Sequence, residues 1–428
     1  MKETENRGRV PRLRFPEFRD AGEWKQKELG ELAAFFKGKG LPKSEILESG
    51  ETLCVHYGEL FTYYSEVINK VTGRTNFNKD KFLSLADDVL MPTSDVTPSG
   101  LAKASCLKFA DVVLGGDILV IRTNKKFVFG EFLARQIRHL ELEVLKLVSG
   151  STVFHLYSSS MEKLKINFPG LSEQQKIAYC LSSLDDLITL ESQKLNALKQ
   201  HKKGLMQQLF PAEGETVPRL RFPEFRGAGE WEKRVIEDFF EVGSSKRVLQ
   251  NDWTTQGVAF YRTRELVSLS KSQPFRSEVF ISEKLFDEIS GWYGLPSEGD
   301  FLVSGVGTLG VAYQVQANDR FYFKDGNVLW FKLKNGIISD FFKYCFEADE
   351  IQDQIIEQAS ISTVGTYTIQ NAKVTKFSCP PNLEEQQRIA DCLSSLDDLT
   401  TAQVQKVEAL KTHKKGLMQQ LFPKLEEV

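Results

Sequence analysis

The chain contains 428 residues, of which 41% are hydrophobic and 26% charged, and its formal net charge is −3 at pH 7. This composition is typical of a soluble globular protein with two or three domains. No run of about 18 apolar residues occurs, so no membrane-spanning segment is predicted, and the slightly acidic balance argues mildly against a chain that wraps nucleic acid alone.

The cysteine and histidine content argues against disulfide and metal chemistry. Six cysteines are scattered without a C-x-x-C pair, and five histidines are dispersed without an H-E-x-x-H motif. Such usage suits a reducing cytoplasm and differs from both a disulfide framework and a zinc knuckle. We therefore expect a cytoplasmic protein that binds no metal ion.

An internal duplication is the most informative feature of the sequence. The string VPRLRFPEFR at 10–19 returns at 217–226, and HKKGLMQQLFP at 201–211 returns unchanged at 413–423. In addition, LSEQQKIAYCLSSLDDL at 171–187 matches LEEQQRIADCLSSLDDL at 383–399. The chain is therefore predicted to consist of two similar halves.

The duplication divides the chain into six predicted parts. Conserved segments cover 1–24 and 212–231, domains of variable sequence cover 25–170 and 232–382, and conserved helices cover 171–211 and 383–428. Each variable domain is predicted to mix strands, such as 112–121 and 301–315, with helices, such as 129–148 and 340–358. The predicted fold class is α+β, with two mixed α/β domains joined by a pair of long antiparallel coiled-coil helices and an internal pseudo-two-fold repeat.

The conserved helices carry apolar residues on alternating four- and three-residue steps, which is the heptad pattern of a coiled coil. The predicted seam consists of Ile177, Leu181, Leu184, Ile188, Leu195, Leu198, Ile389, Leu393, Leu396, Val407 and Leu410. Polar residues at Glu191 and Lys202, and at the equivalent Gln403 and Lys414, would fix the register of a pair. Two amphipathic helices that pack separately on their own domains remain the alternative.

Signals at both ends limit these helices. Ser172 and Asn382 have the spacing of N-terminal caps, and Pro211 and Pro423 follow the last apolar residues. Two copies related by an approximate two-fold axis would run their helices antiparallel and hold two unlike domains apart. The conserved strings would repeat because they build this symmetric frame.

Two motifs resemble catalytic or ligand-binding signals. Gly305, Gly307 and Gly310 spell G-x-G-x-x-G after a predicted strand, but the alternating VAYQV that follows predicts a second strand rather than the helix of a dinucleotide site. The pairs Asp185–Asp186 and Asp397–Asp398 lie on the predicted helices, where we interpret them as solvated helix faces. No methyltransferase N/D-P-P-Y/F/W motif and no Walker motif occurs, so no catalytic residue is predicted.

Clusters of basic residues indicate a binding role instead. The stretch 244–276 contains six Lys or Arg against two acidic residues, interleaved with Ser, Thr, Gln and aromatic rings that suit phosphates and base edges. A thinner cluster lies in the first variable domain. The candidate DNA-binding residues are Lys37, Lys39, Lys43, Arg74, Lys246, Arg247, Arg262, Arg264, Lys271 and Arg276. Solvated surface charges are the alternative interpretation for each of them.

The repeated strings resemble the specificity subunit of type I restriction–modification systems. The resemblance rests on PRLRFPEF followed by Trp at the head of each half, on the EQQKIA and EQQRIA helix starts, and on the KKGLMQQLFP helix ends. It covers nearly the whole chain. The GDFLVSGVGTLG stretch at 299–310 also resembles the strand and glycine turn of the family's recognition domains, whereas the equivalent stretch near Asp88 departs from it.

This resemblance implies a non-catalytic subunit with two target-recognition domains, each of which reads one half of a split, asymmetric site in double-stranded DNA. It implies that two modification subunits dock on the conserved helices and carry out adenine methylation with S-adenosylmethionine. Restriction subunits that use ATP and Mg²⁺ for translocation and cleavage would join them, and this chain itself would bind no cofactor. A two-headed scaffold that grips proteins rather than DNA is the alternative, because the net charge is acidic.

Overall fold

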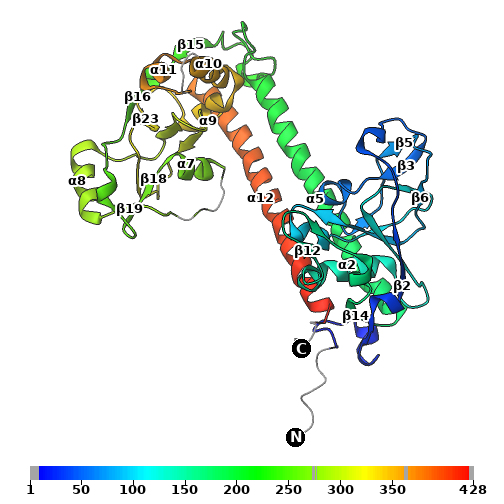
Figure 1. Cartoon of the computed structure of the whole chain (residues 1–428). Coiled ribbons are helices and arrows are strands. Elements are labelled where there is room, and N and C mark those ends of the chain that lie inside the picture. Colours follow the sequence, from blue (N-terminus) through cyan, green and yellow to red (C-terminus); the bar gives the residue numbers. More distant parts are fainter. Residues whose placement is uncertain (1–8, 272–274, 276, 361–364, 424–428) are drawn as a thin grey trace. The chain divides into compact units, whose positions relative to one another are not determined.

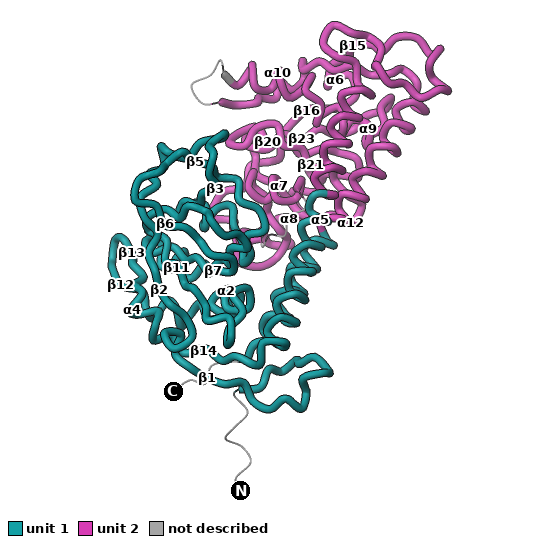
Figure 2. Tube along the Cα trace, turned by 90° about the vertical axis from the view of Figure 1, so that its right-hand side faces the viewer, with its two compact units in different colours: residues 1–193, 405–428 teal, residues 194–404 magenta. Residues whose placement is uncertain are grey.

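The computed structural model describes residues 9–271, 275, 277–360 and 365–423. The chain divides into two compact units, one formed by residues 1–193 and 405–428 and the other by residues 194–404 (Figure 2). Figure 1 labels two 39-residue helices, α5 (Leu171–Leu209) and α12 (Leu383–Leu421). Each contributes one part to unit 1 and the other part to unit 2 (Figure 2). In the described parts of the chain, none of the helices combines the length and the apolar character needed to cross a bilayer.

Unit 1 is built around a five-stranded sheet in the order β2-β11-β7-β9-β4, with further sheets β5-β3-β10-β6, β12-β13-β8 and β1-β14. Its strands are β1 (Lys25–Glu28), β2 (Ala33–Lys37), β3 (Thr52–Val55), β4 (Val67–Ile68), β5 (Arg74–Thr75), β6 (Phe82–Leu83), β7 (Asp88–Pro92), β8 (Ser94–Asp95), β9 (Ser105–Leu107), β10 (Val113–Leu114), β11 (Ile118–Thr123), β12 (Ser149–Gly150), β13 (Phe154–His155) and β14 (Lys165–Phe168). Its α-helices besides the two long ones are α1 (Glu59–Thr62), α2 (Gly130–His139), α3 (Glu141–Leu145) and α4 (Ser158–Met161).

Unit 2 contains two four-stranded sheets, β16-β23-β20-β21 and β17-β19-β18-β22, and the pair β15-β24. Its strands are β15 (Glu232–Val235), β16 (Phe240–Ser244), β17 (Trp253–Thr254), β18 (Val258–Tyr261), β19 (Phe280–Ile281), β20 (Phe301–Ser304), β21 (Ala312–Gln314), β22 (Phe321–Phe323), β23 (Val328–Leu333) and β24 (Lys376–Cys379). Its shorter α-helices are α6 (Ile236–Phe239), α7 (Thr263–Ser270), α8 (Glu283–Tyr293), α9 (Ser339–Glu347), α10 (Asp349–Ser360) and α11 (Ile369–Val374).

The two units share a central set of strand pairings. In unit 1, β11 pairs antiparallel with β2 and β7, and β10 pairs parallel with β3. In unit 2, β23 pairs antiparallel with β16 and β20, and β22 pairs parallel with β18. The register also agrees, since Leu119 lies opposite Lys37 and Leu329 lies opposite Ser244. The duplication therefore continues through the variable domains, and the predicted fold class is confirmed.

A buried aspartate stands at the start of the equivalent strand in each unit. Asp88 accepts a hydrogen bond from the Leu85 N–H at 2.8 Å, and Asp300 accepts one from the Ser297 N–H at 3.0 Å. A carboxylate can be buried only when donors compensate for its lost hydration. The same side chain therefore fixes the same turn in both units.

Three predicted elements are interrupted in the structure. The predicted helix 129–148 is divided into α2 and α3 at Leu140, and the predicted helix 340–358 is divided into α9 and α10 at Ala348, whose ψ is 151°. Acidic residues directly after each break suit the N-terminus of a new helix, a signal that the continuous apolar pattern obscured. The predicted strand 112–121 is divided into β10 and β11 by a turn at residues 115–117.

The glycine motif forms the predicted strand–turn–strand. β20 and β21 pair antiparallel across it, with Val303 opposite Ala312, and the Gly310 N–H donates to the Ser304 carbonyl at 3.1 Å. The third glycine therefore leads into a strand. This arrangement lacks the helix N-terminus that a dinucleotide pyrophosphate requires.

Candidate nucleic-acid interface

The two long helices run antiparallel within each unit. In unit 1, Ile177 and Leu181 near the start of α5 share an apolar core with Leu421 at the end of α12, and Glu191 lies beside Lys406. In unit 2, Leu209 at the end of α5 shares a core with Ile389 and Leu393 near the start of α12. All eleven predicted seam residues are buried or half-buried, which fits helices packed on each other rather than separately.

The repeated string VPRLRFPEFR ties both helices together in each unit. In unit 1, the Arg14 guanidinium makes a bidentate contact with the Glu173 carboxylate, at 2.8 and 2.7 Å, and the Leu13 N–H donates to the Gln420 carbonyl at 3.0 Å. Glu173 lies in the first turn of α5 and Gln420 in the last turn of α12. The string therefore clamps the start of one helix to the end of the other.

Unit 2 contains an equivalent clamp. The Nε and Nη2 of Arg221 each donate to one carboxylate oxygen of Glu385 at 2.7 Å. The Leu220 N–H donates to the Gln208 carbonyl at 2.9 Å. The indole N–H of Trp231 donates to Glu385 at 3.3 Å, as Trp24 does to Glu173. The string repeats because the antiparallel pair has two such ends.

The structure corrects the predicted N-terminal caps of the two long helices. Helix α5 begins at Leu171, so Ser172 lies inside its first turn and does not cap it. Asn382 does precede α12, and its side-chain oxygen accepts the Glu384 N–H at 2.8 Å. Glu385, however, binds Arg221 instead of closing a capping box with Asn382.

A charged cluster joins the helix pair to the globular part of each unit. In unit 1, the Lys414 ammonium contacts Asp185 and Glu66 at 2.5 and 2.9 Å. In unit 2, the equivalent Lys202 contacts Asp397 and Glu347 at 2.7 and 3.1 Å. The two polar seam residues therefore bind a carboxylate on the opposite helix and one on a target domain.

These contacts overturn one interpretation of the paired aspartates. Asp185 and Asp397 were expected on solvated faces, but Asp185 also binds the fully buried Arg135 at 2.9 Å, and Asp397 binds Lys343 at 3.0 Å. Asp186 and Asp398 are exposed as expected. The sequence could not show that one residue of each pair binds a side chain 50 or more residues away in a variable domain.

The clusters hold their carboxylates in the charged form. Burial alone would raise the pKa of Glu66, but the charges of Lys414 and Arg138 outweigh it and lower this pKa to about 2. Burial opposes ionisation of Asp397 as well, yet the hydrogen bond from Lys202 and the charge of Lys343 lower its pKa. Each carboxylate therefore stabilises the folded state while it remains ionised.

Acid should weaken the frame for this reason. The folded pKa of Glu66 lies below its ordinary value of 4.5, so its contribution is complete above that pH and is lost as the pH falls toward about 2. The expected loss in the free energy of unfolding is on the order of 2–3 kcal/mol. Urea unfolding of the protein and of Glu66→Gln between pH 5 and pH 2 measures it. The variant should show a shallower fall, whereas Glu143→Gln, an exposed pair with Lys146, should follow the parent protein.

Three loops meet at one edge of unit 1, next to the ends of β2, β3 and β10. The loop edge of unit 1 is defined by residues 37–43, 56–58 and 115–117. The Lys39 N–H donates to the Leu114 carbonyl at 3.0 Å, and the Gly115 N–H donates to the Val55 carbonyl at 3.0 Å. Gly38 must be a glycine, because a Cβ there would lie 2.0 Å from the Gly115 carbonyl oxygen. The segments carry three Lys and one Asp.

The equivalent loops form the loop edge of unit 2, defined by residues 244–248, 262–264 and 324–327. The Lys324 N–H donates to the Tyr261 carbonyl at 2.9 Å, and the Ser245 hydroxyl donates to the Phe323 carbonyl at 2.8 Å. This edge carries five Lys or Arg and one Asp. It is therefore more basic than its counterpart, and the strand register makes Lys39 and Lys246 equivalent.

The structure brings most candidate DNA-binding residues to these two edges. Unit 1 places Lys37, Lys39 and Lys43 there, and unit 2 places Lys246, Arg247, Arg262 and Arg264 there. Lys37 and Lys39 contact Asp117 and Asp80 at 3.4 and 3.2 Å. Such exposed pairs are weak, so a phosphate can compete for the lysines.

The other candidates lie elsewhere. The Arg74 guanidinium donates to the Gly50 carbonyl at 3.1 Å, on the side where β3 begins, away from the loop edge. Lys271 is exposed in the turn after α7. Arg276 lies outside the described residues. Sequence reasoning missed His56, which stands in the loop edge of unit 1.

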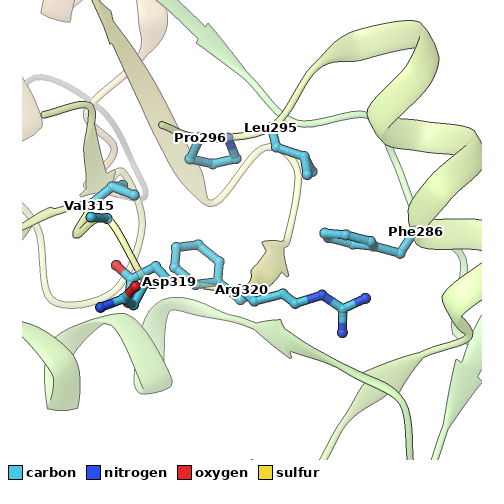
Figure 3. Close-up of a pocket in the computed structure, with 9 residues that line it drawn as sticks. Phe286, Leu295, Pro296, Val315, Asp319 and Arg320 are labelled. Atoms are coloured by element: carbon cyan, nitrogen blue, oxygen red, sulfur yellow. The ribbon is translucent and has the colours of Figure 1, made fainter. Parts of the chain in front are cut away.

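Two hollows open in unit 2. One, of about 440 Å³, is lined by Lys246 and Arg247 of the loop edge and by Trp292 and Tyr293 at the end of α8. Trp292 is 85% exposed. The other, of about 380 Å³, holds none of the candidate residues; Figure 3 shows Phe286 and Arg320 side by side in it, and the guanidinium lies 5.1 Å from the ring centre. Among the described residues, His, Cys, Asp and Glu form no group that could hold a metal ion.

Comparison with known proteins agrees with this architecture. A family model described as the type I restriction modification DNA specificity domain matches residues 21–200 and again 228–411. The chain therefore belongs to this family, as its repeated strings predicted. The two matches cover one target domain and most of one long helix each.

Individual relatives point the same way. A putative type I restriction enzyme specificity subunit of Haemophilus influenzae is 26% identical over 264 residues, which cover 61% of this chain and 63% of that protein. The MjaVIII specificity subunit of Methanocaldococcus jannaschii is 22% identical over 428 residues, covering 96% and 93%. The crystal structure of the S subunit from M. genitalium superposes with a TM-score of 0.62 at 15% identity, covering 97% of this chain and all of that one, and therefore supports the fold.

Proposed function

We propose that this chain is the DNA-specificity subunit of a type I restriction–modification complex. Each unit reads one half of a bipartite, asymmetric site in double-stranded DNA through its loop edge. The antiparallel helices set the gap between the half-sites and dock two modification subunits. S-adenosylmethionine, ATP and Mg²⁺ would bind those modification subunits and the restriction subunits that join them, and this chain would perform no catalysis.

One observation supports this proposal above the others. The clamps, the ion-pair clusters and the central strand pairings recur in both units, whereas the loop edges carry different side chains. A scaffold that only binds two protein partners would not need equivalent loops held at equivalent positions in both domains. A protein that recognises two different half-sites does need this arrangement, because base edges are recognised by side chains held at fixed positions.

The modular arrangement predicts the result of a domain exchange. Replacing residues 25–170 with the equivalent segment of a relative that has a different target should change one half of the methylated site and leave the other half and the gap unchanged. Methylation sequencing of cells that express the chain with its modification partner measures this. Replacement of residues 232–382 is the matched experiment for the other half. A change in both halves, or in neither, would contradict the modular reading.

Affinity should also depend on salt. Phosphate contacts release counterions, so binding of the complex to DNA should weaken steeply between about 50 and 200 mM salt. A protein-binding scaffold would show weak DNA affinity that is indifferent to sequence.

A further inference from the structure

The internal repeat allows the two units to be compared residue by residue at their loop edges. Parallel pairing of β3 with β10 and of β18 with β22 makes Val55 equivalent to Tyr261, since these carbonyls accept hydrogen bonds from Gly115 and Lys324. The next residues are 56–58, which form the turn before α1, and 262–264, of which Arg262 precedes α7 and Thr263 and Arg264 begin it. We call these two segments the reading turns.

The backbone of both reading turns is held in the same way. The His56 N–H donates to Glu59 at 2.7 Å, and the Arg262 N–H donates to Glu265 at 3.0 Å. The following leucines, Leu60 and Leu266, are fully buried. Glutamate and leucine therefore hold the first residue of the segment, His56 or Arg262, in the same way in both units.

The side chains at these equivalent positions differ completely. Unit 1 presents His-Tyr-Gly at 56–58, and unit 2 presents Arg-Thr-Arg at 262–264. When two copies keep the residues that hold a turn but exchange those that the turn displays, the displayed residues are free to follow two different ligands. This pattern is expected of positions that select bases.

His56 is prepared to donate a hydrogen bond. Its Nδ1 accepts the Gly58 N–H at 3.2 Å, so the proton of the neutral ring resides on Nε2. Burial lowers the pKa of His56, and the charge of Lys43 lowers it further, so the ring stays neutral near pH 7. An Nε2–H donor suits an acceptor such as the N7 of a purine in the major groove.

Arg264 is the corresponding group of unit 2. Its side chain is 62% exposed, and Glu265 and Glu278 hold its guanidinium at 3.0 and 2.7 Å. Arg262 is instead engaged by both oxygens of the buried Glu265, at 3.2 and 2.7 Å, which suits a positioning role. Glu265 accepts from Nε and Nη2 of Arg264, at 3.3 and 3.0 Å, and so orients the guanidinium. The pair with Glu278 is exposed and therefore weak, so Nη1 and Nη2 can turn to O6 and N7 of a guanine.

We propose that the reading turns determine specificity, with His56 donating to a purine in one half-site and Arg264 reading a guanine in the other. This inference rests on the proposed function, because it assigns residues to the two half-sites. In this proposal the reading turns contact bases, whereas the surrounding lysines contact phosphates, which suit their flexible ammonium groups. These lysines are Lys37, Lys39, Lys43 and Lys246.

The test uses the full chain with its modification partner and methylation sequencing of the host genome. His56→Ala and Arg264→Ala should each relax one base pair in a different half-site, lowering discrimination at that position about 5- to 150-fold. Arg264→Lys should relax the same position, because an ammonium cannot form the bidentate contact. Lys146→Ala and Lys284→Ala remove exposed charges from the end of α3 and from α8, respectively, and should leave the motif unchanged.

The outcomes distinguish a failure of the proposed function from a failure of the reading turns alone. A parent protein that methylates no split motif would refute the proposed function itself. A split motif that both alanine variants leave intact, while circular dichroism shows them folded, would refute only the reading turns. Uniformly weaker methylation without altered base preference would likewise refute them, since it indicates phosphate contacts. If His56→Ala and Arg264→Ala both relaxed base pairs of the same half-site, the assignment of one reading turn to each half-site would be refuted.

Discussion

Replacing Arg221 with methionine should lower the free energy of unfolding of unit 2 by about 3–5 kcal/mol, because the buried Glu385 would lose its partner. The side chains of Arg221 and Glu385 are 6% and 1% exposed, so water cannot replace the lost contact. The Trp231 indole would remain as a single donor at 3.3 Å, which is too little to compensate a buried charge. Guanidinium chloride unfolding followed by circular dichroism measures the change.

The same string supplies the control. Arg219, two residues earlier, pairs with Glu215 at 3.6 Å on the surface, and Arg219→Met should cost less than 1 kcal/mol, about the value of an exposed pair. The double variant Arg221→Met with Glu385→Leu should recover part of the loss, because no buried charge is then left alone. Equal effects of Arg221→Met and Arg219→Met would show that the clamp does not stabilise the frame. Arg14 and Glu173 provide an independent repetition in unit 1.

The frame could be predicted from the sequence because its cause is visible there. Identical strings that recur at offsets of 207 and 212 residues indicated two copies of one unit, and the heptad steps of α5 and α12 indicated which surfaces of the helices are buried. The ion pairs of the frame could not be predicted in the same way. Arg14 and Glu173 are 159 residues apart, and only the topology brings them together. Their repetition as Arg221 and Glu385 was nevertheless a signal that could have been used.

The candidate interface was predicted less completely. Charge clustering led to Lys39 and Lys246, which the strand register makes equivalent, but it could not find His56, because a neutral side chain adds nothing to a charge count. The signal for His56 lies in the repeat: Glu59-Leu60 and Glu265-Leu266 follow equivalent strands, and the residues before them differ. The helix breaks at Leu140 and Ala348 were missed because an apolar period continues through them while the backbone does not.

Shortening both long helices by one heptad should shorten the gap between the half-sites without changing the bases read. Removing residues 190–196 from α5 and 402–408 from α12 deletes equivalent segments around the centre of the pair. Seven residues correspond to about 10 Å of helix length. They also correspond to a rotation that falls only about 20° short of two full turns, so the apolar seam stays on the same side of each helix. Both charged clusters, Lys202 with Asp397 and Lys414 with Asp185, also remain.

The expected reduction is about three base pairs, because ten base pairs of B-DNA span about 34 Å. Methylation sequencing reads the gap directly, and the bases of both half-sites serve as an internal control. Exchanging residues 190–196 with 402–408 between the helices changes composition but not length, and should leave the gap as it was. A seven-residue insertion at the same positions should lengthen it. If the gap stayed constant through deletion and insertion while methylation continued, the helices would not set the spacing, because a rigid antiparallel pair cannot change length without moving what it carries.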